Sequence, residues 1–188
     1  MPEDQNRAGP EWVRIAAVVG AAVVVAFLVW LLAIRDSGDS GGDTTSASAT
    51  GPTIVTPADL SGVPGDLGHP IYWAGPRTGA QLELTETSDG KVYVRYLENG
   101  ATAGDTRPDF LTIGTYPFPG AQKALRDLGS KPGEKSEDVS GGGILVYGAQ
   151  NPTSVYVAYP DQDLQIEVFD PDPKQALEVA RNELRPLG

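Results

Sequence analysis

The chain has 188 residues, a formal net charge of −11 at pH 7, one histidine and no cysteine. The lack of cysteine excludes disulfide scaffolds, CxxC redox centres and thiolate zinc sites. Residues 54–188 carry 11 Lys and Arg against 19 Asp and Glu, and the basic residues are scattered. Because phosphate backbones are held by clustered basic residues, no nucleic acid is expected as a partner.

From Ile15 to Ile34 the chain has twenty consecutive residues without a charge, and twelve of them are Ile, Val, Leu or Phe. As a helix this segment would span about 30 Å, the thickness of the hydrocarbon core of a bilayer. We therefore expect a transmembrane helix at residues 15–34, which makes the lipid bilayer a partner of the chain. Small residues four positions apart, such as Ala16 and Gly20, would allow a homodimer through this helix, although such pairs are also common in monomeric anchors.

The basic residues that flank this segment predict its orientation. Arg7 and Arg14 lie before it, and Arg35 is the only basic residue close behind it. The positive-inside rule then places residues 1–14 in the cytoplasm and the C-terminal part of the chain outside the cell membrane. The alternative is a cleaved signal peptide, since Ala47-Ser48-Ala49 matches a cleavage pattern. A signal peptide, however, has an apolar region of only about 7 to 15 residues with its cleavage site close behind.

Two further segments follow the predicted transmembrane helix. Residues 35–53 consist mostly of Ser, Gly, Asp, Thr and Ala, a composition that predicts a disordered linker. Residues 54–188 have the length of one compact domain. Their apolar residues alternate in several short segments and follow a helical period in two others. We therefore expect a single extracytoplasmic α+β domain.

Residues 81–97 are predicted to form a β-hairpin, and the positions of the apolar side chains decide its register. A two-residue turn at Asp89-Gly90 would place the apolar residues of the two strands on opposite faces. A three-residue loop with Gly90 in the left-handed conformation places them on one face instead. The predicted cross-strand pairs are Leu82–Tyr96, Glu83–Arg95 and Leu84–Val94.

A second hairpin is predicted at residues 154–169. Its expected pairs are Val155–Val168, Val157–Ile166 and Tyr159–Leu164. The strand sequences VYVRY (92–96) and VYVAY (155–159) are nearly identical, and helices are expected at residues 119–128 and 173–184. The sequence therefore predicts an antiparallel sheet of two similar β-rich halves, each followed by a helix, with one face of the sheet covered.

No catalytic or metal-binding motif stands out in the sequence. His69, the only histidine, lies between Gly68 and Pro70, and we interpret it as a loop residue. Four aspartates lack the spacing of an EF-hand and suit turns and helix caps, with a calcium site as the alternative. They are Asp161, Asp163, Asp170 and Asp172. No cofactor is expected.

The most suggestive surface is one face of the predicted sheet. In the registers above, Tyr93 and Tyr156 are the central residues of the two similar strands and point away from the core, together with Arg95 and Glu167. Tyrosine and charged residues on an open sheet face are typical of a recognition surface. We therefore predict that Tyr93, Arg95, Tyr156 and Glu167 bind a partner. The alternative is that tyrosine is simply a favourable strand residue on a solvated face.

Four segments carry a resemblance to known proteins. They are LGHPIYWAGP (67–76), VYVRYL (92–97), TIGTYPFPGAQKAL (112–125) and VYVAYPDQDLQIEVFDPDP (155–173). In these segments the chain resembles uncharacterised single-pass membrane proteins of high-GC actinobacteria. The resemblance covers the whole predicted domain and implies an extracytoplasmic location in such a bacterium. It implies no activity, cofactor or binding residue.

Taken together, the sequence predicts a membrane-tethered, extracytoplasmic binding module of the bacterial cell envelope rather than an enzyme. Its expected partner is an envelope protein or a glycan. The alternative is a carboxylate-based hydrolase of an envelope polymer, which would need a cleft that holds two acids about 5 to 9.5 Å apart.

Overall fold

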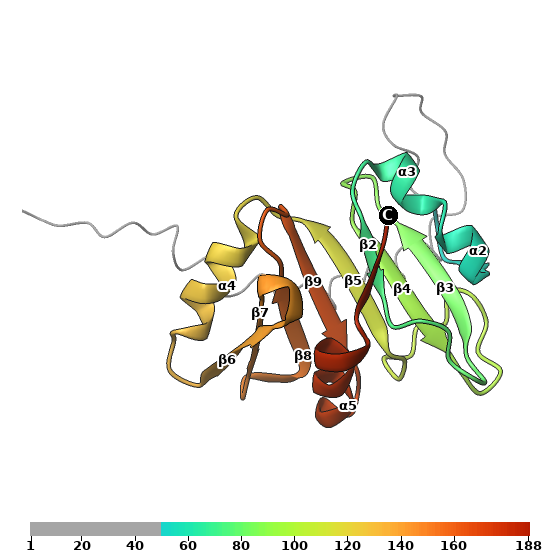
Figure 1. Ribbon diagram of the computed structural model, residues 1–188. Helices are drawn as coiled ribbons and strands as arrows, with labels where there is room; N and C mark the ends of the chain where they lie inside the picture. Colours follow the sequence, from blue (N-terminus) through green and yellow to red (C-terminus); the bar gives the residue numbers. More distant parts are fainter. Residues whose placement is uncertain (1–49) are drawn as a thin grey trace, which may run out of the picture.

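The computed structural model describes residues 50–188, which form an α+β fold around one antiparallel sheet of eight strands (Figure 1). The predicted cytoplasmic tail, the predicted transmembrane helix and residues 35–49 of the predicted linker lie outside the described residues. Within residues 50–188, no helix has the length and apolar character needed to cross a bilayer. The first strand begins at Thr53, one residue before the predicted start of the domain.

Two four-stranded meanders make up the sheet and meet at its centre. In spatial order the strands are β1 (Thr53–Val55), β3 (Gln81–Glu86), β4 (Val92–Leu97), β5 (Thr112–Pro117), β9 (Leu164–Phe169), β8 (Asn151–Ala158), β7 (Gly143–Gly148) and β6 (Glu134–Val139). Every neighbouring pair is antiparallel. The strands β1, β3, β4 and β5 therefore form one meander, and β6, β7, β8 and β9 form the other. The pairing of β5 with β9 joins the two meanders.

The remaining elements lie outside this sheet. They are the helices α2 (Pro57–Leu60), α3 (Val63–Leu67), α4 (Ala121–Gly129) and α5 (Pro173–Glu178), a 3₁₀ turn at Ser140–Gly142, a π-helical turn at Val179–Glu183, and the paired strands β2 (Ile71–Trp73) and β10 (Arg185–Leu187). α4 follows β5 and α5 follows β9, so each meander is followed by a helix, as predicted.

Both predicted hairpins form in the predicted registers. Glu83 pairs with Arg95 in the first hairpin, and Gly90 takes the left-handed conformation with a φ angle of 77°. In the second hairpin, Val157 pairs with Ile166. Because β8 ends at Ala158, the ladder stops before the predicted pair Tyr159–Leu164, which lies next to the turn. The alternation of apolar residues was sufficient to choose these registers, since a slip of one residue would invert both faces.

The second predicted helix forms over nearly its whole predicted length, but its last turn is π-helical. α5 begins after Asp172, whose side chain accepts a hydrogen bond from the amide of Lys174, and it ends at Glu178. One π-helical turn follows, and the chain then becomes extended as β10. Pro186 prevents the helix from continuing beyond this turn, because proline disfavours a helical conformation in the residue before it, here Arg185.

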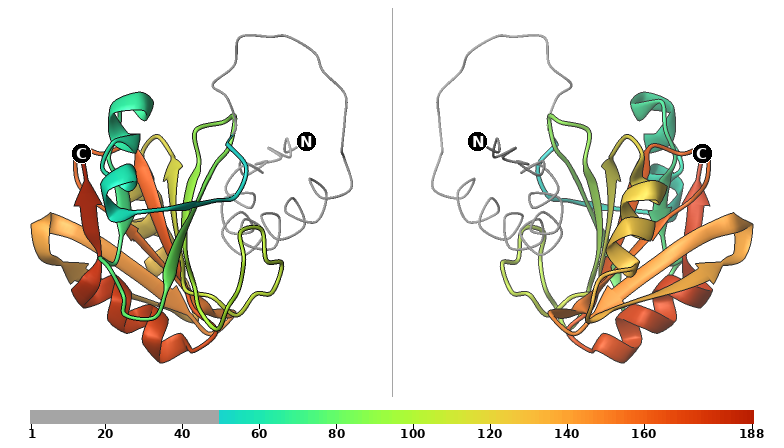
Figure 2. Two further views of the ribbon diagram at one scale, coloured as in Figure 1. Left: turned by 90° about the vertical axis from the view of Figure 1, so that its right-hand side faces the viewer. Right: turned by 90° about the vertical axis from the view of Figure 1, so that its left-hand side faces the viewer.

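The sheet is covered on both faces, so the prediction of one covered face is wrong. α5 packs with Leu145 and Val157 in the larger core cluster, whereas α4 packs with Ile144, Val146 and Tyr156 on the other face. The right-hand view of Figure 2 shows these helices on opposite sides of the strands β6 and β7. β7 is apolar at successive positions, and such a strand requires cover on both sides.

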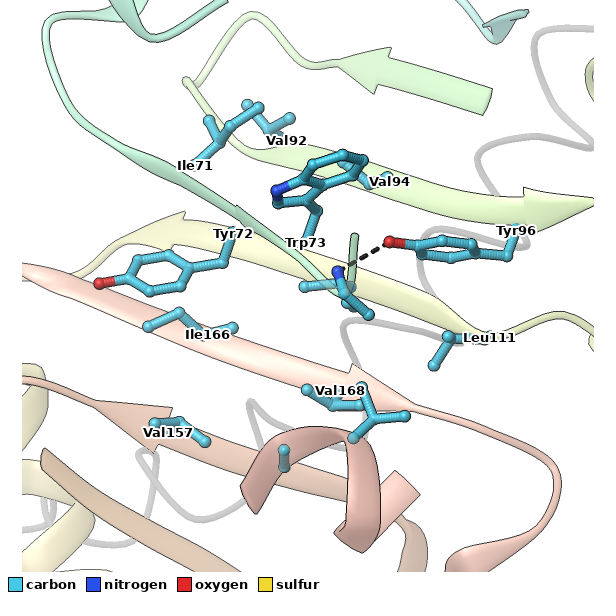
Figure 3. Close-up of a cluster of buried hydrophobic side chains, with 14 of the residues drawn as sticks. Ile71, Tyr72, Trp73, Val92, Val94, Tyr96, Leu111, Val157, Ile166 and Val168 are labelled. Carbon is cyan, nitrogen blue, oxygen red and sulfur yellow. Dashed lines mark hydrogen bonds between the residues drawn. The ribbon is translucent and has the colours of Figure 1, made fainter. Parts of the chain in front are cut away.

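The larger core is closed by β2, which crosses the sheet face without joining its ladder (Figure 3). β2 pairs with β10, and two amides, one in β2 and one directly after it, are bonded to side chains of the large sheet. The hydroxyl of Tyr96 accepts from the amide of Ala74 at 2.7 Å, and the hydroxyl of Thr115 accepts from the amide of Tyr72 at 3.0 Å. These bonds satisfy buried donors that would otherwise each cost about 1–3 kcal/mol.

Candidate functional site

The structure gathers the four predicted binding residues on one face of the sheet. Tyr93 pairs with Gly114, Gly114 with Glu167, and Glu167 with Tyr156, so these residues form one row across β4, β5, β9 and β8. Arg95 lies two residues further along β4 and therefore on the same face. This is the face opposite the larger core, as the sequence predicted.

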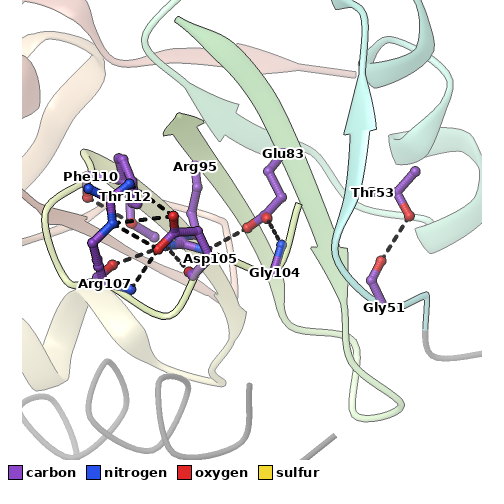
Figure 4. A network of polar contacts seen from close by, with 9 residues as sticks. All are labelled: Gly51, Thr53, Glu83, Arg95, Gly104, Asp105, Arg107, Phe110 and Thr112. Atoms are coloured by element: carbon purple, nitrogen blue, oxygen red, sulfur yellow. Dashed lines mark hydrogen bonds and ion pairs between the residues drawn. The ribbon is translucent and has the colours of Figure 1, made fainter. Parts of the chain in front are cut away.

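The same residues are buried, so the expectation of an open sheet face is wrong. The exposed fractions are 3% for Tyr93, 2% for Arg95, 8% for Tyr156 and 1% for Glu167. The loop at residues 98–111 folds over the Arg95 end of this face (Figure 4), and α4 packs on Tyr156. The strand pattern alone could not reveal this cover, because alternation within a strand does not specify how the loop after β4 folds or where α4 packs.

A buried ion pair fixes the loop to the sheet. Arg95 Nη1 lies 2.7 Å from Glu83 Oε1, and both side chains are at most 2% exposed. Arg95 Nη2 also donates to the carbonyls of Asp105 and Arg107, at 2.8 and 3.2 Å. The amide of Gly104 donates to the second oxygen of Glu83 at 2.6 Å. Each charge is therefore satisfied by the other and by the loop main chain, the condition under which a buried ion pair is tolerated.

The outer side of this loop is held by a second pair of charges. Arg107 binds both carboxylate oxygens of Asp105, and these hydrogen bonds lower the pKa of Asp105 to about 2. Phe110 lies within cation–π distance of Arg107, at 5.1 Å, and of the buried Arg95, at 5.2 Å. The loop is thus an ordered cover rather than an open recognition segment.

Glu167 occupies a different environment in the middle of the same face. Its two carboxylate oxygens accept hydrogen bonds from Ser154 at 2.7 Å and from Tyr116 at 2.9 Å. It forms no ion pair within residues 50–188. Burial raises the pKa of Glu167 to about 7, although hydrogen bonds from Ser154, Tyr116 and Tyr156 oppose the shift.

Sequence reasoning missed Tyr116, which shapes the centre of this face. Its ring folds back over Gly114, where any Cβ would overlap the phenol, and its hydroxyl reaches Glu167. The ring also meets Tyr93 edge to face, with centroids 5.6 Å apart. Burial, followed by the charge of Glu167, raises the pKa of Tyr116 well above its ordinary value. The available signal was Gly114 itself, because glycine inside a strand often marks a close approach of another group.

A surface hollow of about 340 Å³ lies at the other end of β5 and β9. It is lined by Gly68, His69, Pro70, Pro117, Asp161, Gln162, Asp163 and Leu164. Asp161 and Asp163 are exposed, and neither forms an ion pair with a residue of the described part of the chain. Gln162 is held by the hydroxyl of Tyr72, which donates to it at 2.9 Å.

The hollow therefore brings together His69, which the sequence predicted as a loop residue, and Asp161 and Asp163, which it predicted as turn residues. His69 Nδ1 lies 3.0 Å from the carbonyl of Pro70, so the Nε2 nitrogen is left as the other polar atom of the ring. Asp163 accepts a hydrogen bond at 2.9 Å from the amide of Gly120, the residue before α4, so it ties its turn to a distant segment of the chain. Residues 50–188 hold no group of three or more His, Cys, Asp or Glu side chains placed to ligate a metal ion.

No family model, curated protein or solved structure matches this chain. Its function is therefore inferred from the sequence and from the geometry of the described residues.

Replacing Arg95 tests the role of the buried ion pair. Arg95→Met should lower the free energy of unfolding by about 3–5 kcal/mol, because Glu83 would remain buried without its cation. Denaturant titration of the full chain in detergent measures this loss. Arg107→Met is the matched control, since its side chain is half exposed and its ion pair should contribute no more than about 1 kcal/mol. Equal losses in the two variants would contradict the assignment.

Gly114 provides a second test, of the close approach of Tyr116. Gly114→Ala should cost about 1–3 kcal/mol, because the added methyl group overlaps the buried phenol. In a double-mutant cycle, Tyr116→Ala should remove most of this penalty, which gives a coupling energy of at least about 1 kcal/mol. Gly65→Ala is the control: its Cβ would meet open space in α3, so stability should be unchanged or slightly higher. Additive losses would show that Tyr116 does not require this glycine.

Proposed function

We propose that this chain is a membrane-tethered, extracytoplasmic binding module of the bacterial cell envelope, and that it contacts its partner through the hollow at the end of β5 and β9. The observation that carries the proposal is a contrast in exposure. The polar groups of the sheet face are buried and mutually bonded, whereas Asp161 and Asp163 at the hollow are exposed and form no ion pair within residues 50–188.

The location rests on the N-terminal sequence. The uncharged segment at residues 15–34 has the length of a membrane span, and the basic residues around it favour an N-terminus in the cytoplasm. The polar residues 35–49 would then act as a tether that lets the folded part reach partners near the membrane surface. Proximity to the membrane raises the effective concentration of such partners.

The walls of the hollow indicate what kind of partner suits it. Pro70 and Pro117 supply rigid apolar walls, and Gln162 is held in place by Tyr72. The two exposed carboxylates favour a partner that presents basic groups, which agrees with the net charge of −8 on residues 54–188. An envelope protein with a basic surface is the partner that this chemistry favours.

A hydrolase of an envelope polymer is the second candidate. Asp161 and Asp163 face one hollow beside His69, and paired carboxylates are the groups that glycoside hydrolysis requires. Glu167, whose pKa of about 7 would suit a general acid, is only 1% exposed and so does not meet a polymer in this structure. The hydrolase proposal therefore depends on the aspartates of the hollow alone.

The absence of cysteine from the chain allows a direct test of location. Ser88 is exposed in the loop between β3 and β4, so Ser88→Cys should react with a membrane-impermeant maleimide on intact cells. Gln5→Cys, in the predicted cytoplasmic tail, is the matched control and should react only after the membrane is permeabilised. Labelling of Gln5→Cys on intact cells, or protection of Ser88→Cys, would contradict the proposed orientation.

Cross-linking in cells, followed by recovery of the full chain, tests the contact site. Recovery of the specific partner should fall about tenfold when Asp161→Asn and Asp163→Asn are combined, because two exposed charge contacts of about 0.7 kcal/mol each are lost. The control combines Asp127→Asn with Asp138→Asn, which changes the net charge equally at exposed sites outside the lining of the hollow. Equal recovery from both variants would refute the hollow as the contact site. Turnover of an envelope polymer that is lost with Asp161→Asn would instead favour the hydrolase.

A further inference from the structure

The pairing of β5 with β9, which we call the central seam, is the only strand pairing within residues 50–188 that joins the two meanders. It runs from the pair Thr112–Phe169 to the pair Pro117–Leu164. Pro117 and Leu164 also line the hollow. The last pair of the seam is therefore part of the wall of the hollow.

Glu167 lies on the seam and is the buried group least suited to carry a charge. It pairs with Gly114 across the seam, and its carboxylate binds Tyr116 of β5 on one side and Ser154 of β8 on the other. It is 1% exposed, and its direct hydrogen-bond donors are hydroxyl groups. A buried carboxylate without a cation is costly, whereas its protonated form can both donate to and accept from hydroxyls.

The charged groups around Glu167 do not supply a counterion. The titratable groups that face it are tyrosines, namely Tyr93 of β4, Tyr116 of β5 and Tyr156 of β8, and its charge helps to raise the pKa of each of them. In the loop at residues 98–111, Arg107 forms an ion pair with Asp105. Beneath that loop, Arg95 forms an ion pair with Glu83.

α4, which packs on the same face, keeps its charges away from Glu167. It contributes Ala121 and Leu125 to the cluster around Tyr156. Its Lys123 and Asp127 form an exposed ion pair, and Arg126 faces Asp138 of β6 at 3.9 Å. No cation of the described part of the chain is therefore bound to Glu167.

We propose that Glu167 is a proton-operated switch in the central seam: the protonated carboxyl holds β5 against β9, and loss of the proton loosens this pairing and the hollow at its end. The inference goes beyond the proposed binding function and needs no partner. Its physical basis is that ionisation places an uncompensated charge on the only ladder that joins the two meanders.

The pH range of the switch follows from the burial of Glu167. Burial raises the pKa from the ordinary value of 4.5 to about 7 in the folded chain. A carboxyl group whose pKa is raised on folding contributes stability that is fully present below the unfolded value and is lost as the pH rises through the folded value. The seam should therefore be most stable below about pH 4.5, weaken as the pH rises from about 4.5 to about 7, and retain none of this stabilisation at pH 8.

Hydrogen exchange of the full chain in lipid nanodiscs at pH 6 and pH 8 tests this switch. After correction for intrinsic exchange rates, protection of the peptides that cover β5 and β9 should fall roughly tenfold between the two pH values. In Glu167→Gln the protection should be independent of pH, because the amide stays neutral. Glu98→Gln, an exposed residue, is the matched control and should keep the wild-type dependence. Equal protection of the wild-type seam at both pH values would overturn the proposal, as would an unchanged dependence in Glu167→Gln.

A second measurement covers the case in which Glu167→Gln fails to fold. Carbon-13 NMR of the Glu167 carboxyl in the wild-type chain should show a titration midpoint near pH 7. A midpoint at or below about 5 would overturn the switch. Neither measurement involves the binding partner, so failure of the switch and failure of the proposed binding function can be told apart.

Discussion

The pairing of β5 with β9 is the constraint on which the rest of the structure depends. These six residue pairs join two four-stranded meanders into one sheet, and they place side chains from distant parts of the chain in common rows. The row of Tyr93, Gly114, Glu167 and Tyr156 exists only because of this pairing. The last pair of the ladder also forms part of the hollow, so the same contact shapes the buried face and the exposed site.

Two carboxylates, Glu83 and Glu167, are buried in different environments on the sheet face opposite the larger core, which we call the second face. Glu83 and Arg95 neutralise each other, and the loop above them satisfies their remaining hydrogen bonds. Glu167 has hydroxyl partners but forms no ion pair in the described part of the chain, so its preferred state there is the protonated one. The first arrangement neutralises its charges within the pair, whereas the second depends on a proton near neutral pH.

The hollow differs from this face because its charged side chains, Asp161 and Asp163, are exposed rather than buried. It is built from the loops that follow α3, β5 and β8, and loops placed on a rigid sheet are common carriers of recognition. The covered face stabilises the sheet, and the hollow leaves Asp161 and Asp163 available to a partner. The binding module that we propose would need both, because a rigid fold keeps a contact site preorganised.

The sequence by itself determined the local structure: the hairpin registers, the left-handed Gly90, the helices after each meander, and the set of residues that share the second face. Alternation of side chains, turn chemistry and helix caps act over a few residues, so they can be read directly from the chain. Only the tertiary structure decided that α4 and the loop at residues 98–111 cover this face, that Tyr116 folds over Gly114, and that His69 and Asp161 line the same hollow. The cover by α4 and the shared hollow depend on packing between segments far apart in the sequence, whereas the loop at residues 98–111 and Tyr116 lie close to the residues they cover. In neither case does a local pattern specify which group will cover a given face.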